Sequence, residues 1–366
     1  MSREKLHELD VIRSFSAIGV VFTHYMYIFL EYAIPGSGPN MLEHENGDWG
    51  GSIVGLFFVI SGAALYYNHP VIKKGGLLNF YKKRWLSIFP MFYVAWAVMY
   101  YINSERAGGW YWGGPRKNFL LTFFGMDGYL MHHGRNYYCL GEWFLGAIII
   151  LYILYPIIIW AFNRIRWIST AIVALLFILN PLRHYLSSAP DSNIFFRFVK
   201  FYNSHIIISD NTCLWTCLMY FWLGLLFIEY RDRLIKPWTI GLSIVIVLVI
   251  ALVPLGLAKI YSGIIMASAF YVLLSAVTPF LLKLSPLMAV IRFISKYSYG
   301  TFLVHHVLLY AHMAHFRNTY FTQLSSTLFF IPIYAIIILN GVLLTKLVDI
   351  LMYAFRTLIT ELKSCL

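Results

Sequence analysis

The sequence predicts an all-α, polytopic membrane protein with about ten transmembrane helices, folded as a single transmembrane domain over residues 1–366 with no appended soluble domain. Of its 366 residues, 60% are hydrophobic and only 12% are charged, and the mean hydropathy is +0.70. A soluble domain of this length needs more polar surface than that. The net charge of +12 is therefore interpreted as basic cytoplasmic loops, and no nucleic-acid partner is expected.

The spanning helices are expected at residues 10–32, 51–68, 86–103, 142–163, 167–186, 212–229, 238–257, 260–282, 297–316 and 325–354. Residues 118–131 are too short to span and contain Gly125 and Asp127, so they are placed at the outer interface or in a re-entrant segment. With the N-terminus inside, most Lys and Arg residues fall on the cytoplasmic side. Both termini are therefore expected in the cytoplasm, and the chain is expected to be multi-pass in the plasma (inner) membrane.

The first expected helix carries ionisable residues that a spanning helix normally avoids. Arg13 and His24 are eleven residues apart, which is three turns plus about 20°, so they share one face about 16 Å apart along the axis. Glu31 falls on the same stripe, and Tyr27 lies close to it. Taken singly, Arg13 is equally explained by snorkelling to lipid phosphates and His24 by a core hydrogen bond. Together they favour a working site, because His serves well as a general base or acyl acceptor near neutral pH.

At these residues the chain resembles the acyltransferase-3 family of integral membrane O-acyltransferases. The resemblance rests on Arg-x10-His ending at His24, on FFVISG at residues 57–62, and on FYKKR at residues 80–84 followed by Pro90. It also rests on Trp143 with Tyr152 and Pro156, and on SY at residues 298–299 followed by FLVH ending at His305. The match covers nearly the whole chain in the expected order. It implies acyl-CoA as donor and a sugar or other surface hydroxyl as acceptor.

The stretch around Lys82, Lys83 and Arg84 is similar to a basic loop of the family. Cytoplasmic Lys and Arg suit the phosphates of acetyl-CoA, although any membrane protein carries such a topology signal. Where the family often has a second Arg, this chain has Ser87, so Lys82 or Lys83 would have to compensate. Arg13 is expected at the same depth, and its distance from His24 is comparable to the reach of an extended pantetheine arm.

Three further features have two interpretations each, and a fourth has one. Ser61 and Gly62 permit close helix packing, which is favoured over chemistry, but Ser61 is kept as a candidate cofactor contact. His305 shares a helix face with His312, yet without acidic or Cys partners a helper role is favoured and no metal is predicted. Cys213 and Cys217 are explained by packing rather than a disulfide or metal. Lys346 and Asp349 are expected to form an ion pair.

The outer segment 104–143 is rich in aromatic residues, which suits either an interfacial belt or a platform for sugar rings. Trp143, Glu142 and His305 are the candidate acceptor contacts, with Asp127 and Arg135 also available to hydroxyls.

The sequence thus predicts an O-acetyltransferase in which His24 is general base or acyl carrier, oriented by Glu31 and Tyr27. The expected partners are acetyl-CoA, a cell-surface glycan or lipid-linked sugar, and membrane lipids, and self-association is left open. The alternative is a transporter or flippase of a lipid-linked glycan. Such proteins often show repeats with matching broken helices, which this sequence lacks. A scaffold without chemistry would leave Arg13 and His24 unexplained.

Overall fold

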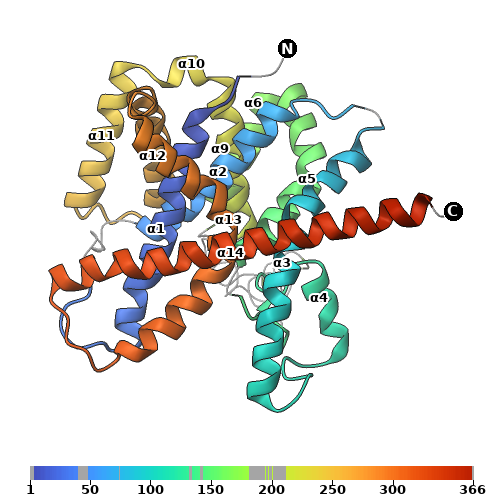
Figure 1. The fold of residues 1–366 in the computed structure, drawn as a ribbon. Helices are drawn as coiled ribbons and strands as arrows, with labels where there is room; N and C mark the ends of the chain where they lie inside the picture. The colour runs from blue at the N-terminus through green and yellow to red at the C-terminus, as the bar shows by residue number, and fades with distance from the viewer. Residues whose placement is uncertain are drawn as a thin grey trace.

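A computed structural model of the chain describes residues 4–39, 48–73, 75–131, 134–140, 143–180 and 212–364, together with 194, 197 and 200. Within this part the fold is helical, and the only β contact is an isolated bridge between Gly36 and Phe321. Figure 1 shows the helices gathered into one bundle, with α14 running across the directions of α1 and α2. The prediction of an all-α polytopic membrane protein is confirmed at this level.

The main helices are α1 (His7–Glu31), α2 (Trp49–Asn68), α3 (Leu77–Ala107), α5 (Trp143–Arg164), α6 (Arg166–Ile178), α9 (Leu214–Glu229), α11 (Pro237–Leu252), α12 (Lys259–Leu281), α13 (Ser285–Met313) and α14 (Gln323–Ser364). Shorter helices are η1 (Arg116–Asn118), α4 (Phe119–Phe123), α10 (Arg231–Leu234) and η3 (Ala314–Phe316).

Each of the ten stretches expected to span overlaps one of the main helices. Six of these, α1, α2, α3, α5, α12 and α14, are long and apolar enough to cross a membrane, α6, α9 and α11 are shorter apolar helices, and α13 falls in neither group. The expected span 167–186 continues past Asn180 into residues that the structure does not describe. Residues 119–123 form only the short helix α4, which agrees with the prediction that this segment does not span.

The prediction that the basic residues lie in a loop is wrong. Lys82, Lys83 and Arg84 lie in the first turns of α3, which begins at Leu77, nine residues before the predicted span. A helix can continue past the apolar core of a bilayer at no cost, because its backbone hydrogen bonds are internal. The basic residues therefore have fixed directions on a helix.

Small residues bring the helices of the core together. Gly62 of α2 lies against the carbonyl of Phe221 on α9, and Gly224 of α9 lies against the carbonyl of Val59 on α2. A methyl group at either glycine would collide with the facing backbone, so the expected packing role of Gly62 is confirmed. These contacts lie within one large apolar core cluster, and a second cluster joins α1, α13 and α14.

The ends of α1 and α14 are tied together by backbone hydrogen bonds. The amide of Phe321 donates to the carbonyl of Pro35 at 3.0 Å, and the amide of Ser37 donates to the carbonyl of Phe321 at 2.8 Å. This holds the loop after α1 beside the loop before α14, and so fixes α1 against α13.

Of two further predictions about side chains, one agrees with the structure and the other does not. Cys213 and Cys217 are buried and are not in a disulfide, as the packing interpretation expects. The ion pair between Lys346 and Asp349 is wrong: both are exposed on α14, and no salt bridge joins them. A spacing of three residues places two charges near each other, but their long side chains gain little by meeting at an exposed position.

Candidate active site

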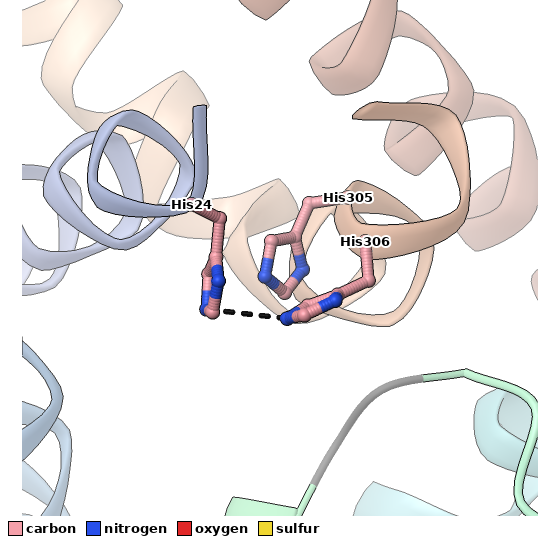
Figure 2. A group of neighbouring side chains, drawn as sticks. All are labelled: His24, His305 and His306. Carbon is pink, nitrogen blue, oxygen red and sulfur yellow. Dashed lines mark hydrogen bonds between the residues drawn. The ribbon is translucent and has the colours of Figure 1, made fainter. Parts of the chain in front are cut away.

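Three histidines meet where α1 packs against α13 (Figure 2). His24 comes from α1, and His305 and His306 come from α13. The Nε2 atoms of His24 and His306 are 3.2 Å apart and joined by a hydrogen bond, and the centroids of the His24 and His305 rings are 5.2 Å apart. One Nε2 of the bonded pair carries the proton and the other accepts it.

The tautomer of His305 follows from its surroundings. Its Nδ1 lies 2.5 Å from the carbonyl oxygen of Phe302, which can only accept, so Nδ1 carries the hydrogen. In the neutral ring this leaves the lone pair on Nε2, which is buried without a hydrogen-bond partner. His305 is 1% exposed. An unsatisfied buried acceptor of this kind is typical of a functional site.

These three rings are also the one group among the described residues whose donor atoms are arranged to hold a metal, with all three ligand atoms within 4.8 Å of one another. Imidazole suits zinc and other transition metals, and a Nδ1–H bond to a backbone carbonyl is the usual outer partner of a ligating His. The arrangement therefore fits either metal binding or proton transfer. The prediction that the site works without a metal stays a prediction.

Glu31 is linked to this cluster by Tyr310, a residue of α13. The hydroxyl of Tyr310 donates to Oε2 of Glu31 at 2.5 Å, and the Tyr310 ring is stacked on His306 with centroids 5.9 Å apart. Glu31 was expected to orient His24, but the bonds place it beside the partner of His24. Tyr27 is half-exposed and lines a cavity together with His24.

Arg13 lies in the wall of two cavities toward the other end of α1. A basic cavity of about 420 Å³ is lined by Arg13, Lys83 and Arg84, among others. An inner cavity of about 400 Å³ also includes Arg13, together with Lys296 and Tyr299. Lys82 is exposed and is absent from both walls. The two cavities have four wall residues in common: Arg13, Ile60, Ser61 and Tyr152.

A neck of about 20 Å³ lies beside the histidines, and Phe57, Phe144 and Phe302 line both it and the inner cavity. Their rings are in contact, with centroids 5.9 Å apart for Phe57 and Phe144 and 5.5 Å apart for Phe144 and Phe302. His24 and His305 complete the neck.

Beyond the neck lies an outer cavity of about 200 Å³, which has Val20, His24, Val54 and Trp143 in common with it. Asp48 and Tyr27 also line this outer cavity. Because neighbouring cavities share wall residues, the four cavities lie in a row from Lys83 and Arg84 to Tyr27 and Asp48, with His24 beside the smallest of them. Arg13 and His24 both face this row, as their shared helix face predicts.

The candidate acceptor contacts are partly brought together. Trp143 and His305 both line the neck, whereas Glu142 lies outside the described residues. Asp127 is 2% exposed, so it is closed to a sugar hydroxyl. It binds Thr122 at 3.3 Å and the amide of Gly128 at 3.2 Å, and burial raises its pKa to about 6. Asp127 therefore holds its own loop together.

Sequence reasoning missed three residues. His306 and Lys296 were given no role, yet each faces the site. Asp48, which lines the outer cavity, was also given no role. The SY…FLVH stretch was the available signal for α13, because Tyr299 and Phe302 line the inner cavity and His305 lines the neck.

A family model described as "Acyltransferase domain" matches residues 6–346, which includes every cavity-lining residue named above. No curated protein and no solved structure matches the chain.

Proposed function

Because the chain belongs to the acyltransferase-3 family, whose model covers nearly all of it, we propose that it is a membrane O-acetyltransferase. It transfers an acetyl group from cytoplasmic acetyl-CoA to a hydroxyl of a cell-surface or lipid-linked glycan. The observation that carries the proposal is the row of cavities that runs from Arg84 through Arg13 to His24 and on to Trp143. A donor and an acceptor can meet at His24 from opposite ends of that row.

The donor enters from the basic cavity. Coenzyme A carries several phosphate charges, and Arg13, Lys83 and Arg84 line a space large enough for part of it. Arg can bind phosphate in a bidentate way, through two N–H groups at once, whereas Lys acts as a point charge. Arg13 and His24 are about 16 Å apart along α1, so a pantetheine arm lying in the inner cavity brings its thioester to the neck.

At the neck, His24 assists attack on the thioester. As general base it takes the proton of the acceptor hydroxyl while the new C–O bond forms, and the C–S bond then breaks. The departing thiolate takes up that proton, so the reaction needs no other reagent. As acyl carrier, His24 attacks the thioester first and passes the acetyl group to the hydroxyl afterwards. Both routes require His24 to have a free lone pair.

The acceptor enters from the outer cavity, whose walls carry Trp143 and Tyr27 beside the carboxylate of Asp48. Aromatic faces suit sugar rings, and a carboxylate accepts hydrogen bonds from sugar hydroxyls. A separate apolar cavity of about 900 Å³ is lined by residues of α3, α13 and α14, including Tyr310 and Arg106. It suits the hydrocarbon tail of a lipid-linked acceptor or a membrane lipid.

This function requires the orientation predicted from the charge distribution. The ten main helices cross the plasma (inner) membrane, the basic cavity opens to the cytoplasm, and both termini are cytoplasmic. The rival function, passage of a whole glycan, is disfavoured by the neck of about 20 Å³, which is far smaller than a sugar.

The test measures transfer of labelled acetyl groups from acetyl-CoA to membrane glycans at equal expression. His24→Ala should lower the rate by roughly 10²–10⁴-fold, the usual contribution of a positioned acid–base group. His312→Ala removes an imidazole from α13 outside the three-histidine cluster and serves as the control. A wild-type rate in His24→Ala contradicts the proposal. A metal chelator should leave the wild-type rate unchanged.

A second comparison tests the donor site. Lys83→Gln and Arg84→Gln each remove one charge from the wall of the basic cavity, and each should raise the KM for acetyl-CoA about tenfold, since a hydrogen bond to a charged group contributes roughly 1.5–3 kcal/mol. Lys73→Gln removes an exposed charge near the start of α3 and is the control. Equal KM values for all of these variants would contradict the assignment of the basic cavity.

A further inference from the structure

We propose that the neck is the acyl-binding subsite and that its walls, chiefly Val20 and Val54, limit the transferred group to two carbons. This inference rests on the proposed function and names what sets its donor specificity. The neck lies between the inner and outer cavities and is lined by His24 and His305, so the carbonyl carbon of a thioester at His24 has its acyl tail within the neck.

The volume of the neck sets the limit. A cavity needs about 10–15 Å³ of space to hold one water molecule, and the neck offers about 20 Å³. A methyl group is close to a water molecule in size, so the methyl of an acetyl group fits. Each further methylene adds a group for which the walls leave no room, and close-packed interiors do not yield to it cheaply.

The surrounding packing keeps the neck narrow. Phe144 is held on both sides, with its ring centroid 4.5 Å from that of Phe58 and 5.5 Å from that of Phe302. Phe302 is also the residue whose carbonyl fixes the His305 ring. Widening the neck on this side would therefore disturb the histidine cluster. Val20 and Val54 form the aliphatic part of the wall.

A longer acyl chain has a second obstacle at the outer end. The residues Val20, Val54 and Trp143 line the outer cavity as well as the neck. A chain that passed beyond the neck would enter the cavity in which the acceptor hydroxyl has to approach His24. Longer donors would then exclude the acceptor even where the neck accommodated them.

The test compares acetyl-, propionyl- and butyryl-CoA as donors and takes the ratio of kcat/KM values within each protein preparation, so that loss of folded protein cancels. The wild type should prefer acetyl over propionyl by about tenfold or more, the usual effect of one methylene in a fitted pocket. Val20→Ala and Val54→Ala should each reduce this preference at least threefold, and Val54→Ile should increase it.

Val21→Ala is the matched control. Val21 adjoins Val20 on α1, but its side chain is buried in the second core cluster, away from the neck. Its acetyl-to-propionyl ratio should equal that of the wild type. The inference is overturned if the wild type uses butyryl-CoA as well as acetyl-CoA, or if Val21→Ala changes the ratio as much as Val20→Ala does. Absence of transfer from every donor would instead overturn the proposed function itself.

Discussion

His306 determines which nitrogen of His24 is free to react. The two Nε2 atoms share one hydrogen at 3.2 Å. When His24 donates that hydrogen, its lone pair lies on Nδ1; when His306 donates, the lone pair of His24 Nε2 is occupied by the bond. Only the first tautomer leaves His24 ready to take a proton or an acetyl group. Stacking on Tyr310 holds His306 in place for this role.

Removing His306 should therefore slow acetyl transfer without abolishing it. We expect His306→Ala to lower kcat about three- to tenfold, since a neutral hydrogen bond contributes about 0.5–1.5 kcal/mol. His306→Asn retains a hydrogen-bonding side chain and should recover part of the rate. The measurement is kcat and KM for acetyl-CoA in membranes, and KM should stay near the wild-type value. Equal losses in the Ala and Asn variants would contradict a positioning role.

Asp127 makes the stability of the loop after α4 depend on pH. Burial raises its pKa from 3.8 to about 6, so the folded state binds this proton more tightly than the unfolded state does. The resulting stabilisation is complete below about pH 4 and is lost as pH rises to about 6, and it amounts to roughly 3 kcal/mol.

Asp127→Asn resembles the protonated side chain and should remove this dependence. We expect the apparent unfolding temperature of the wild type in detergent to fall between pH 4.5 and 6.5 more steeply than that of the variant. Thermal unfolding of both proteins across this range is the measurement. If the unfolding temperatures of the two proteins change with pH in the same way, Asp127 does not cause the pH dependence.

At the level of residues, the local spacing of the sequence predicted Arg13 and His24, because a face shared within one helix depends only on the helical repeat. It could not predict His306 as the partner of His24, because the two residues are 282 positions apart and meet only when α1 packs on α13. The partner of Glu31 was missed for the same reason. Asp127 was predicted to be available to the acceptor but is buried. The residues around it in the sequence do not show this burial.

At the level of the elements, the close packing of α2 against α9 depends on two glycines. Gly62 and Gly224 each face a backbone carbonyl of the other helix, so the two backbones touch without intervening side chains. α2 also carries Phe57, Ser61 and Val54, which between them line all four cavities, the neck included. A shift of α2 away from α9 would therefore change the shape of the site.

Gly62→Ala should lower both the stability and the activity of the protein. The added methyl forces the helices apart, and such overpacking costs about 1–3 kcal/mol. Gly241→Ala, in the middle of α11, is the control, because nothing lies within 4 Å of the position that the new methyl would take. It should be neutral or slightly stabilising. Similar apparent unfolding temperatures for the two variants would contradict the close approach of α2 and α9.

The start of α3 is an example of a helix boundary that hydropathy does not predict. Hydropathy marks the part of a helix that lies in lipid, so the predicted span began at residue 86 although the helix begins at Leu77. Basic residues in a loop and basic residues on the extension of a spanning helix give the same pattern. Only the structure separates Lys83 and Arg84, which line the basic cavity, from Lys82, which does not.

For the molecule as a whole, the position of α14 is the feature that sequence patterns describe least well. Its 42 residues would extend about 63 Å, roughly twice the thickness of a bilayer core, so it must tilt strongly or leave the bilayer. Figure 1 shows it crossing the directions of α1 and α2. The exposed Lys346 and Asp349 fit a helix that has left the lipid by that point.

The proposed orientation can be tested with the cysteine that follows α14. In a Cys139→Ser background, Cys365 should react with a membrane-impermeant maleimide only after cells are opened, because the C-terminus is expected in the cytoplasm. Cys213 and Cys217 are buried and should stay unreacted. Cys365→Ser in the same background should abolish the labelling. Labelling of Cys365 in intact cells would place the C-terminus outside and reverse the direction of donor entry.

The aromatic neck also has a consequence for the energy supply of the cell. A row of aqueous cavities open to both compartments would conduct protons and dissipate the membrane potential, and each elementary charge crossing 100 mV releases about 2.3 kcal/mol. Phe57, Phe144 and Phe302 line the neck of about 20 Å³, so the row narrows there to about the size of one water molecule. Under the proposed function, acetyl groups would cross the bilayer covalently without a wide water-filled passage between its two sides.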